Sequence, residues 1–385
     1  MQRAKPSSFF AVNNSNLRPF IIPVFLPHCG CPHHCVFCNQ RAVTSIRQNL
    51  HSPEGVETVI KKYLNYKGKR RGETQIAFFG GNFLGLGPQD ILAFLSVAAR
   101  YVREGRVDGI RFSTRPDSIT HAKMDLIAPF PVQTIELGVQ SMNARVLRLS
   151  ARGHTRAETI SAVNLLHERG YQIGLQLMIG LPGDGEHISY ETGCKVAALE
   201  PDFVRIYPAL VLKDSRMARW FQTGKFRPLS LEKCVTRVKN LYLYFNRHAI
   251  AVIRMGLQAT EGFSQNKEIL AGPYHPAFGH LVHSELFLDM AQTILKTGGI
   301  NRAAVTILVH PRSISKMRGL KNYNIRILQR KFGIRSLQVR PETSLALDGL
   351  RFAAGGAAMT YADLKSEVTN VNGLNQPQRT RQFRR

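Results

Sequence analysis

The chain has 385 residues, of which 44% are hydrophobic and 20% are charged, the composition of an ordinary soluble protein with one large domain or a large and a small one. The N-terminal apolar run RPFIIPVFLP is far too short to span a bilayer, and no secretion signal precedes it, so we expect a cytoplasmic protein without a membrane partner. The formal net charge is +26, from 52 Lys and Arg against 26 Asp and Glu, which favours association with polyanions.

Strand and helix patterns alternate from the N-terminus to about residue 255. Helix starts are marked by Ser52 before Pro53, by a capping box at Thr155 and Glu158, and by Ser230. The expected strands are 21–27, 74–81, 109–117, 134–141, 171–182 and 202–210, and the expected helices are 56–66, 89–105, 143–149, 157–170, 191–199 and 234–245. This order predicts an α/β fold, a parallel sheet covered by helices and closed or partly closed as a (β/α) barrel.

Unusual residues follow five of these strands. They are the cysteine loop 29–38, Gly80-Gly81-Asn82, Arg115-Pro116-Asp117, Gln140-Ser141 and Gly180-Leu181-Pro182. Chemistry in such barrels gathers at the carboxyl ends of the strands, so we expect these segments to surround one site.

The pattern changes after about Arg254. A loop rich in Gly, Pro and His leads to a helix at 284–297 and a small β-α-β pattern from 303 to 344, which indicates an appended α/β domain. The expected divisions are an N-terminal extension 1–17, a barrel 18–255, a C-terminal domain 256–355 and a basic flexible tail 356–385. The appended domain holds a segment without acidic residues whose cations predict a phosphate-binding surface for RNA. They are Arg312, Lys316, Arg318, Lys321, Arg326, Arg330 and Lys331, followed by Arg335 and Arg340.

Four of the six cysteines lie within ten residues, which does not resemble a disulfide framework and is more typical of a metal site. Cys31, Cys35 and Cys38 form a C-x3-C-x2-C array. A structural zinc site would need a fourth ligand, and Cys29 is only one residue from Cys31. Three thiolates are better explained by a cluster that leaves one iron open for a ligand.

This array, with Phe37 before the last cysteine and in the loop after the first strand of a parallel barrel, resembles the radical S-adenosylmethionine (SAM) superfamily. The resemblance implies that Cys31, Cys35 and Cys38 bind a [4Fe-4S] cluster. It also implies that the open iron binds SAM, which is cleaved reductively to a 5′-deoxyadenosyl radical. Phe37 would pack near the adenine, and Cys29 lies outside the motif.

The segment Gly80-Gly81-Asn82 is similar to the superfamily's glycine turn, whose backbone can bind the methionyl ammonium. STRPD, ELGVQS, RGHT and YPALVLKDS resemble the radical domain of the Elongator catalytic subunit and its bacterial relatives, over roughly residues 18–255. By that resemblance Gln140 and Arg152 contact the methionine and carboxylate of SAM. Ser113 and Gln176 stand where relatives carry acidic residues for the ribose hydroxyls.

The resemblance implies that the substrate is RNA, most specifically tRNA, and that a reducing protein donates the electron. The residues after Arg254 do not match the Elongator acetyltransferase domain, so acetyl transfer is not implied. Two alternatives stay open. One is a radical enzyme acting on a small metabolite or tetrapyrrole, and the other is a non-catalytic iron-sulfur protein for RNA binding or electron transfer.

Five further residues fit either function or plain structure. His275, His280 and His283 match no metal-ligand spacing, so packing or solvation is the simpler interpretation. Tyr207 and Lys213, near the end of the last expected strand, could face a substrate or belong to the core and the surface.

Overall fold

The computed structural model describes residues 19–40, 42, 52–68, 72–257, 268–297, 303–353, 358–361 and 363–364. The expected N-terminal extension and nearly all of the expected tail lie outside the described residues. The chain divides into two compact units, with the division between Phe278 and Gly279. No helix in the described part of the chain is long and apolar enough to cross a membrane.

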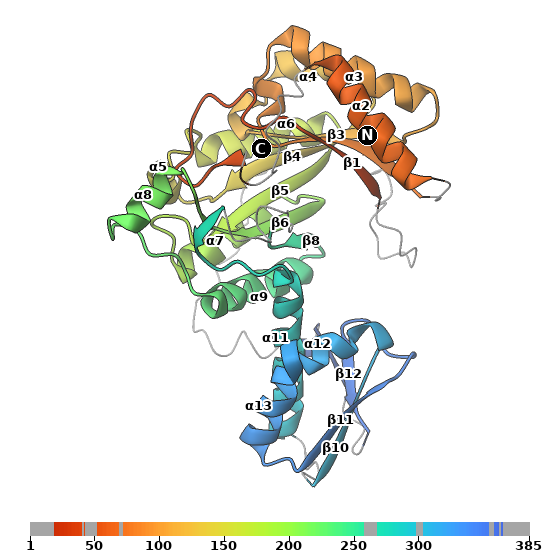
Figure 1. Ribbon diagram of the computed structural model, residues 1–385, viewed down its shortest axis with the longest axis vertical. Helices are drawn as coiled ribbons and strands as arrows, with labels where there is room; N and C mark the ends of the chain where they lie inside the picture. The colour runs from red at the N-terminus through yellow and green to blue at the C-terminus, as the bar shows by residue number, and fades with distance from the viewer. Residues whose placement is uncertain are drawn as a thin grey trace, which may run out of the picture. The chain divides into compact units, whose positions relative to one another are not determined.

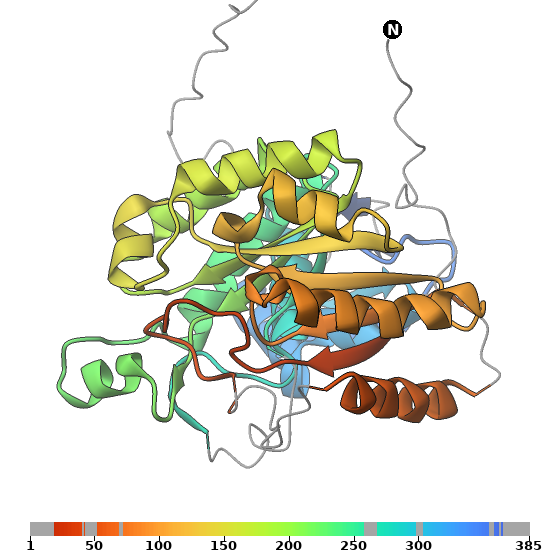
Figure 2. The same ribbon diagram turned by 90° about the horizontal axis from the view of Figure 1, so that it is seen from above.

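The first unit is built on a seven-stranded parallel sheet with the order β1-β2-β3-β4-β5-β6-β8 (Figure 1). The sheet curls into a half-barrel, as the view from above shows (Figure 2). This confirms the predicted partly closed (β/α) barrel. The seven strands are β1 (Phe20–Phe25), β2 (Thr74–Phe79), β3 (Gly109–Thr114), β4 (Val132–Gln140), β5 (Gln172–Ile179), β6 (Phe203–Pro208) and β8 (Ala251–Met255).

The helices of this unit begin where the sequence places their caps. Ser52 accepts a hydrogen bond from the backbone of Gly55 at the start of α2, and Ser230 caps α9 in the same way. Thr155 and Glu158 form the predicted capping box of α6. The helices are α2 (Pro53–Lys67), α3 (Pro88–Arg103), α4 (His121–Ile127), α5 (Ala144–Leu149), α6 (Arg156–Glu168), α7 (Glu186–Ala197), α8 (Arg216–Gln222) and α9 (Leu231–Arg247), with short 3-10 turns η1 (Phe83–Gly85) and η2 (Pro116–Ser118).

A short antiparallel pair that the sequence does not predict extends this unit beyond residue 255. Strand β7 (Val211–Leu212) pairs with β9 (Ile269–Ala271). Strands this short carry no readable alternation of apolar and polar residues. Because β9 pairs with β7, the first unit continues to Phe278.

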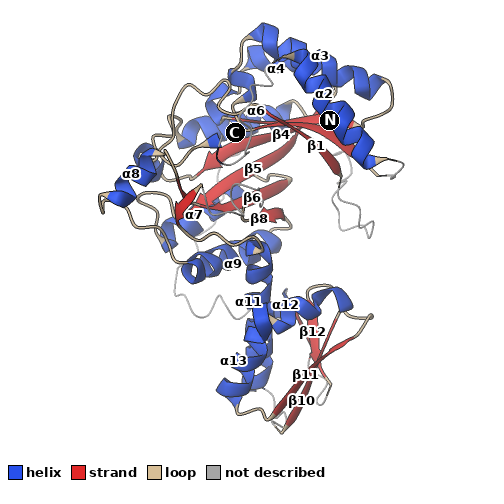
Figure 3. Ribbon diagram, in the orientation of Figure 1, coloured by secondary structure: helices blue, strands red, loops and turns tan. Residues whose placement is uncertain are grey.

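The second unit contains the predicted β-α-β pattern and two strands that the sequence does not show (Figure 3). Strands β10 and β11 are parallel, and β12 and β13 add antiparallel to give the order β11-β10-β12-β13. Helices α11 and α13 are joined by Asn324, whose side-chain amide donates to the backbone oxygen of Ser284 at 2.8 Å. The elements are α11 (Phe278–Thr297), β10 (Ala304–Val309), η3 (Pro311–Ser313), α12 (Ile314–Arg318), η4 (Leu320–Asn322), α13 (Tyr323–Phe332), β11 (Ser336–Pro341), β12 (Gly349–Phe352) and β13 (Ala358–Thr360).

Candidate functional site

The cysteine loop leaves the carboxyl end of β1 and folds back on the end of β2. His28 and Gly30 have positive φ angles of 61° and 67°, which turn the chain sharply before the first cysteine of the array. The amide of His28 donates to the carbonyl of Gly80 at 3.0 Å, and the amide of Asn82 donates to the carbonyl of Cys29 at 2.8 Å. The loop after β1 and the glycine turn after β2 are therefore held together by their backbones.

Gly81 is required by this close approach. A Cβ atom at Gly81 would lie 2.5 Å from the carbonyl oxygen of Cys29 and 2.6 Å from that of Leu26, and both obstacles are backbone atoms. Gly80 has a φ angle of +94°, which a residue with a side chain adopts only with strain. Both glycines thus shape the site that the sequence predicts, while their contact with a cofactor stays a prediction.

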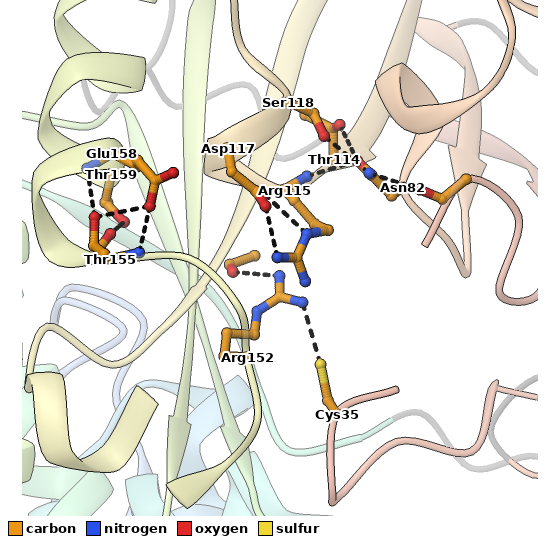
Figure 4. A network of polar contacts seen from close by, with 12 residues as sticks. Cys35, Asn82, Thr114, Arg115, Asp117, Ser118, Arg152, Thr155, Glu158 and Thr159 are labelled. Carbon is orange, nitrogen blue, oxygen red and sulfur yellow. Dashed lines mark hydrogen bonds and ion pairs between the residues drawn. The ribbon is translucent and has the colours of Figure 1, made fainter. Parts of the chain in front are cut away.

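Asn82 connects this turn to the end of β3. Its buried side-chain amide donates to the carbonyl of Gly30 and to Ser118 Oγ, each at 2.9 Å (Figure 4). Its amide oxygen accepts from Thr114 Oγ1 at 2.6 Å and from the backbone of Arg115 at 3.0 Å. These bonds occupy the side chain of Asn82, and its backbone amide is bonded to Cys29, so Asn82 serves here to join the loops and its contact with a cofactor stays a prediction.

The three thiols of the array lie close enough to affect one another. Cys35 is buried, while Cys31 and Cys38 are half-buried. Burial, followed by the neighbouring sulfur of Cys35, raises the pKa of the Cys38 thiol to about 12, and burial also raises the pKa of Cys31. Metal binding needs the thiolates, so loading of this site has to release protons.

Arg152 lies directly against this array. Its Nη1 donates to Cys35 Sγ at 3.4 Å and its Nη2 donates to the carbonyl of Gly138 at 2.7 Å (Figure 4). Its Nε is buried and has no hydrogen-bond partner. The predicted contact with a SAM carboxylate is therefore available through Nε, and each terminal nitrogen keeps a second N–H.

A second buried guanidinium, that of Arg115, lies beside Arg152 (Figure 4). It pairs with both carboxylate oxygens of Asp117, at 2.9 and 2.7 Å, and keeps its Nη1 buried without a partner. Burial raises the pKa of Asp117, but the bonds from Arg115 outweigh it and lower the pKa overall. The two guanidiniums face one carboxylate and a set of thiols, an environment that suits an anionic cluster with thiolate ligands.

Three of the remaining predicted cofactor residues, Ser113, Gln140 and Gln176, lie on neighbouring strands of the half-barrel. Gln176 Nε2 on β5 donates to Gln140 Oε1 at the end of β4, at 3.2 Å. Ser113 on β3 lines a tight crevice together with Cys29 and Gly81. Phe37, in the cysteine loop, packs against a buried apolar cluster that includes Val146, Leu181 and Met217. Their contacts with SAM stay predictions.

A buried ionic network in the sheet escaped the sequence analysis. Glu136 on β4 accepts from Arg111 Nε on β3 at 3.0 Å and pairs with Arg205 Nε on β6 at 2.9 Å. Strand β5 lies between β4 and β6, and its Gly174 is opposite Glu136. Because Gly174 has no side chain, Arg205 can reach Glu136 across β5. Arg205 Nη1 also reaches the Tyr207 hydroxyl at 3.4 Å, so Tyr207 is tied to this network. The sequence signal for this network is the presence of Arg111, Glu136 and Arg205 within otherwise apolar strands.

His154 is another buried residue that sequence patterns did not single out. Both of its ring nitrogens are buried, and it lies in the RGHT segment after Arg152. Burial, followed by the charges of Arg152 and Arg115, lowers its pKa to about 3. His154 is therefore neutral at physiological pH and adds no charge to the site.

His275, His283 and Lys213 have partners outside the three cysteines of the array. His283 stacks on Tyr361 in the second unit, and His275 Nδ1 accepts from the backbone of Ala277. The carbonyl of Lys213 accepts from Asn39 Nδ2 at 2.8 Å. Within the described ranges, no group of three or more His, Cys, Asp or Glu side chains is arranged to hold a single metal ion.

Two family models match the chain. The model described as the radical SAM superfamily matches residues 25–188, and the one described as the Radical_SAM C-terminal domain matches residues 201–287. The first match contains the cysteine array, the glycine turn, Arg115, Gln140 and Arg152. The cofactors of that superfamily are a [4Fe-4S] cluster and SAM.

Curated relatives are similar over part of their length. An uncharacterized protein of Methanocaldococcus jannaschii is 28% identical over 228 residues, which are 57% of this chain and 70% of that protein. A tRNA uridine(34) acetyltransferase of Methanocaldococcus infernus is 30% identical over 125 residues, 32% of this chain and only 23% of that enzyme. The solved structure of an archaeal Elp3 from the same organism, lacking its N-terminus, superposes with a TM-score of 0.55 at 17% identity, covering 86% of this chain and 73% of that one. This last likeness concerns the fold alone.

Proposed function

The chain belongs to the radical SAM superfamily, and we propose that it is an enzyme that cleaves SAM reductively in order to modify RNA, with tRNA as the substrate. The observation that carries the first half is the C-x3-C-x2-C loop, held by its backbone against the Gly80-Gly81 turn and contacted by the buried Arg152. The cofactors would supply a 5′-deoxyadenosyl radical that abstracts hydrogen from the substrate.

The residues of the site have distinct parts in this proposal. Cys31, Cys35 and Cys38 hold the cluster, and the N–H of Arg152 on Cys35 Sγ orients that ligand and offsets its negative charge. The backbone around Gly80 and Gly81 would bind the amino group of SAM, and the lack of a side chain at Gly81 lets this turn lie against the cysteine loop. Gln140 and Gln176 are hydrogen-bonded to each other, and they would orient SAM through the amide atoms that this bond leaves, Gln140 Nε2 and Gln176 Oε1. Ser113 would offer its hydroxyl to the ribose.

The RNA half of the proposal is supported by charge and by likeness. The net charge of +26 and the acid-free segment 311–340 favour a polyanionic substrate. One curated relative carries a name that specifies tRNA uridine, although the match covers a minor part of that enzyme. We also propose that a reducing protein donates the electron, as cleavage requires one.

The test is an anaerobic incubation of the reconstituted, reduced protein with SAM, with and without bulk tRNA, in which 5′-deoxyadenosine is quantified. We expect tRNA to stimulate its formation, and the stimulation to weaken as the salt concentration rises. Mass spectrometry of nucleosides from the treated tRNA would then identify the product. Formation of 5′-deoxyadenosine that is indifferent to tRNA would contradict the RNA substrate and redirect the search to small metabolites.

A further inference from the structure

The second unit contains an open groove of about 450 Å³ between the start of α13 and the edge strand β11. Its lining residues are Arg318, Asn322, Ile325, Leu337, Gln338, Val339 and Arg340. They come from the end of α12, the turn before α13, the first turn of α13 and the edge strand. None of the lining residues is acidic, so the groove presents two guanidinium groups and no carboxylate.

The two arginines have their charges available. Arg340 Nε and Nη2 both donate to Gln338 Oε1, at 3.1 and 2.8 Å, which fixes the guanidinium and leaves Nη1 without a partner among the described residues. Arg318 is exposed and has no acidic partner among the residues that the structure describes. The following acid along the chain, Glu342, already accepts from Ser344 and pairs with Arg351. An anion entering the groove would therefore meet no competing carboxylate.

The rest of the groove suits the flat, apolar face of a base. Ile325, Leu337 and Val339 give it an apolar part. Lys321 and Asn322 have φ angles of 50° and 60°, two consecutive left-handed residues without being glycine. The Asn322 side chain makes no capping bond at the start of α13, so its amide is available to hydrogen-bond a base edge.

We propose that this groove binds one nucleotide of the RNA substrate, with the phosphate between Arg318 and Arg340 and the base against Ile325 and Leu337. The groove is larger than a lone phosphate needs, and its combination of cationic and apolar parts matches a nucleotide. This inference rests on the proposed function, because it assigns a contact surface for the same RNA. The site lies entirely within the second unit.

The test measures binding of fluorescently labelled bulk tRNA to the full-length protein at several salt concentrations. The test variant is Arg318→Gln with Arg340→Gln, and its matched control is Arg103→Gln with Lys296→Gln, which removes the same charge from exposed positions outside the groove and outside segment 311–340. We expect the test variant to bind about tenfold more weakly and the slope of log affinity against log salt to fall by about two. We expect the control to change affinity less than about threefold.

A third variant, Ile325→Ala, probes the base-binding part. It should weaken binding about fivefold while leaving the salt slope unchanged, because apolar contact with a base is not ionic. Thermal unfolding of each variant verifies that the fold is kept. If wild-type protein binds tRNA with a steep salt dependence and the test variant binds like its control, the groove is not the site, and the proposed function stands. If the wild-type protein shows no salt-dependent binding of tRNA, the RNA substrate itself is refuted.

Discussion

Replacing Gly81 by alanine should disrupt the cysteine loop without touching a cysteine. The new Cβ would lie 2.5 Å from the Cys29 carbonyl oxygen, whereas ordinary van der Waals contact begins at 3.4 Å, so the carbonyl would have to retreat by about 0.9 Å. That carbonyl accepts the amide of Asn82, and its movement would break the link between the two loops. Overpacking of this kind typically costs about 1–3 kcal/mol, so we expect the free energy of unfolding to fall by about 2 kcal/mol.

The assay is urea unfolding of the apo-protein, followed by iron quantification after reconstitution. Gly81→Ala should shift the urea midpoint down and retain less iron per chain than the wild type. The control is Gly87→Ala, where φ is −61° and the added Cβ would have Asp90 Oδ2 as its nearest neighbour, at 3.7 Å. This variant should cost less than about 1 kcal/mol and load iron normally. If the two variants are indistinguishable in both measurements, the cysteine loop does not depend on its close contact with the Gly80-Gly81 turn.

Three further predictions address the buried charges. Arg152→Met should make the reduction potential of the reconstituted cluster more negative, because it removes the N–H that donates to Cys35 Sγ. Arg152→Lys should give an intermediate potential. The measurement is a redox titration followed by electron paramagnetic resonance, and an unchanged potential would oppose this prediction. Glu136→Gln should lower the free energy of unfolding by about 3–5 kcal/mol, since Arg111 and Arg205 would stay buried without a counter-charge, and a loss under 1 kcal/mol would refute the role of this ionic network. The pKa of His154 is about 3 when folded and about 6.5 when unfolded, so the unfolded chain takes up a proton first as the pH falls. The free energy of unfolding should therefore drop by about 1.4 kcal/mol per pH unit below 6.5. In denaturation curves at pH 7 and 5, His154→Gln should remove this contribution to the pH dependence of stability.

Helix caps and apolar strand patterns, which are read from neighbouring residues, were sufficient to predict the order of most elements in the first unit. The caps at Ser52, Thr155 and Ser230 and the apolar strands give its elements their order, and the segments that follow Phe25, Phe79 and Thr114 meet at one edge because parallel strands end on the same side. The cysteine array was identified from spacing alone.

What the sequence could not predict depends on contacts between distant segments. Glu136 is paired because Arg111 and Arg205 lie on strands whose register brings them to it, and register is not visible in one strand. Asn82 seemed part of a cofactor turn, yet its side chain connects two loops, since Thr114 and Gly30 converge on it only in the fold. The pair β7 and β9 is too short for periodicity to show.

The central claim is that Cys31, Cys35 and Cys38 support reductive cleavage of SAM. The most direct measurement is the amount of 5′-deoxyadenosine and methionine formed per chain by the anaerobically reconstituted, reduced protein, beside the Cys35→Ser and Cys234→Ser variants. We predict cleavage by the wild type and by Cys234→Ser, whose buried cysteine lies in α9, and none by Cys35→Ser. Absence of cleavage by wild-type protein that carries an intact cluster would contradict the account.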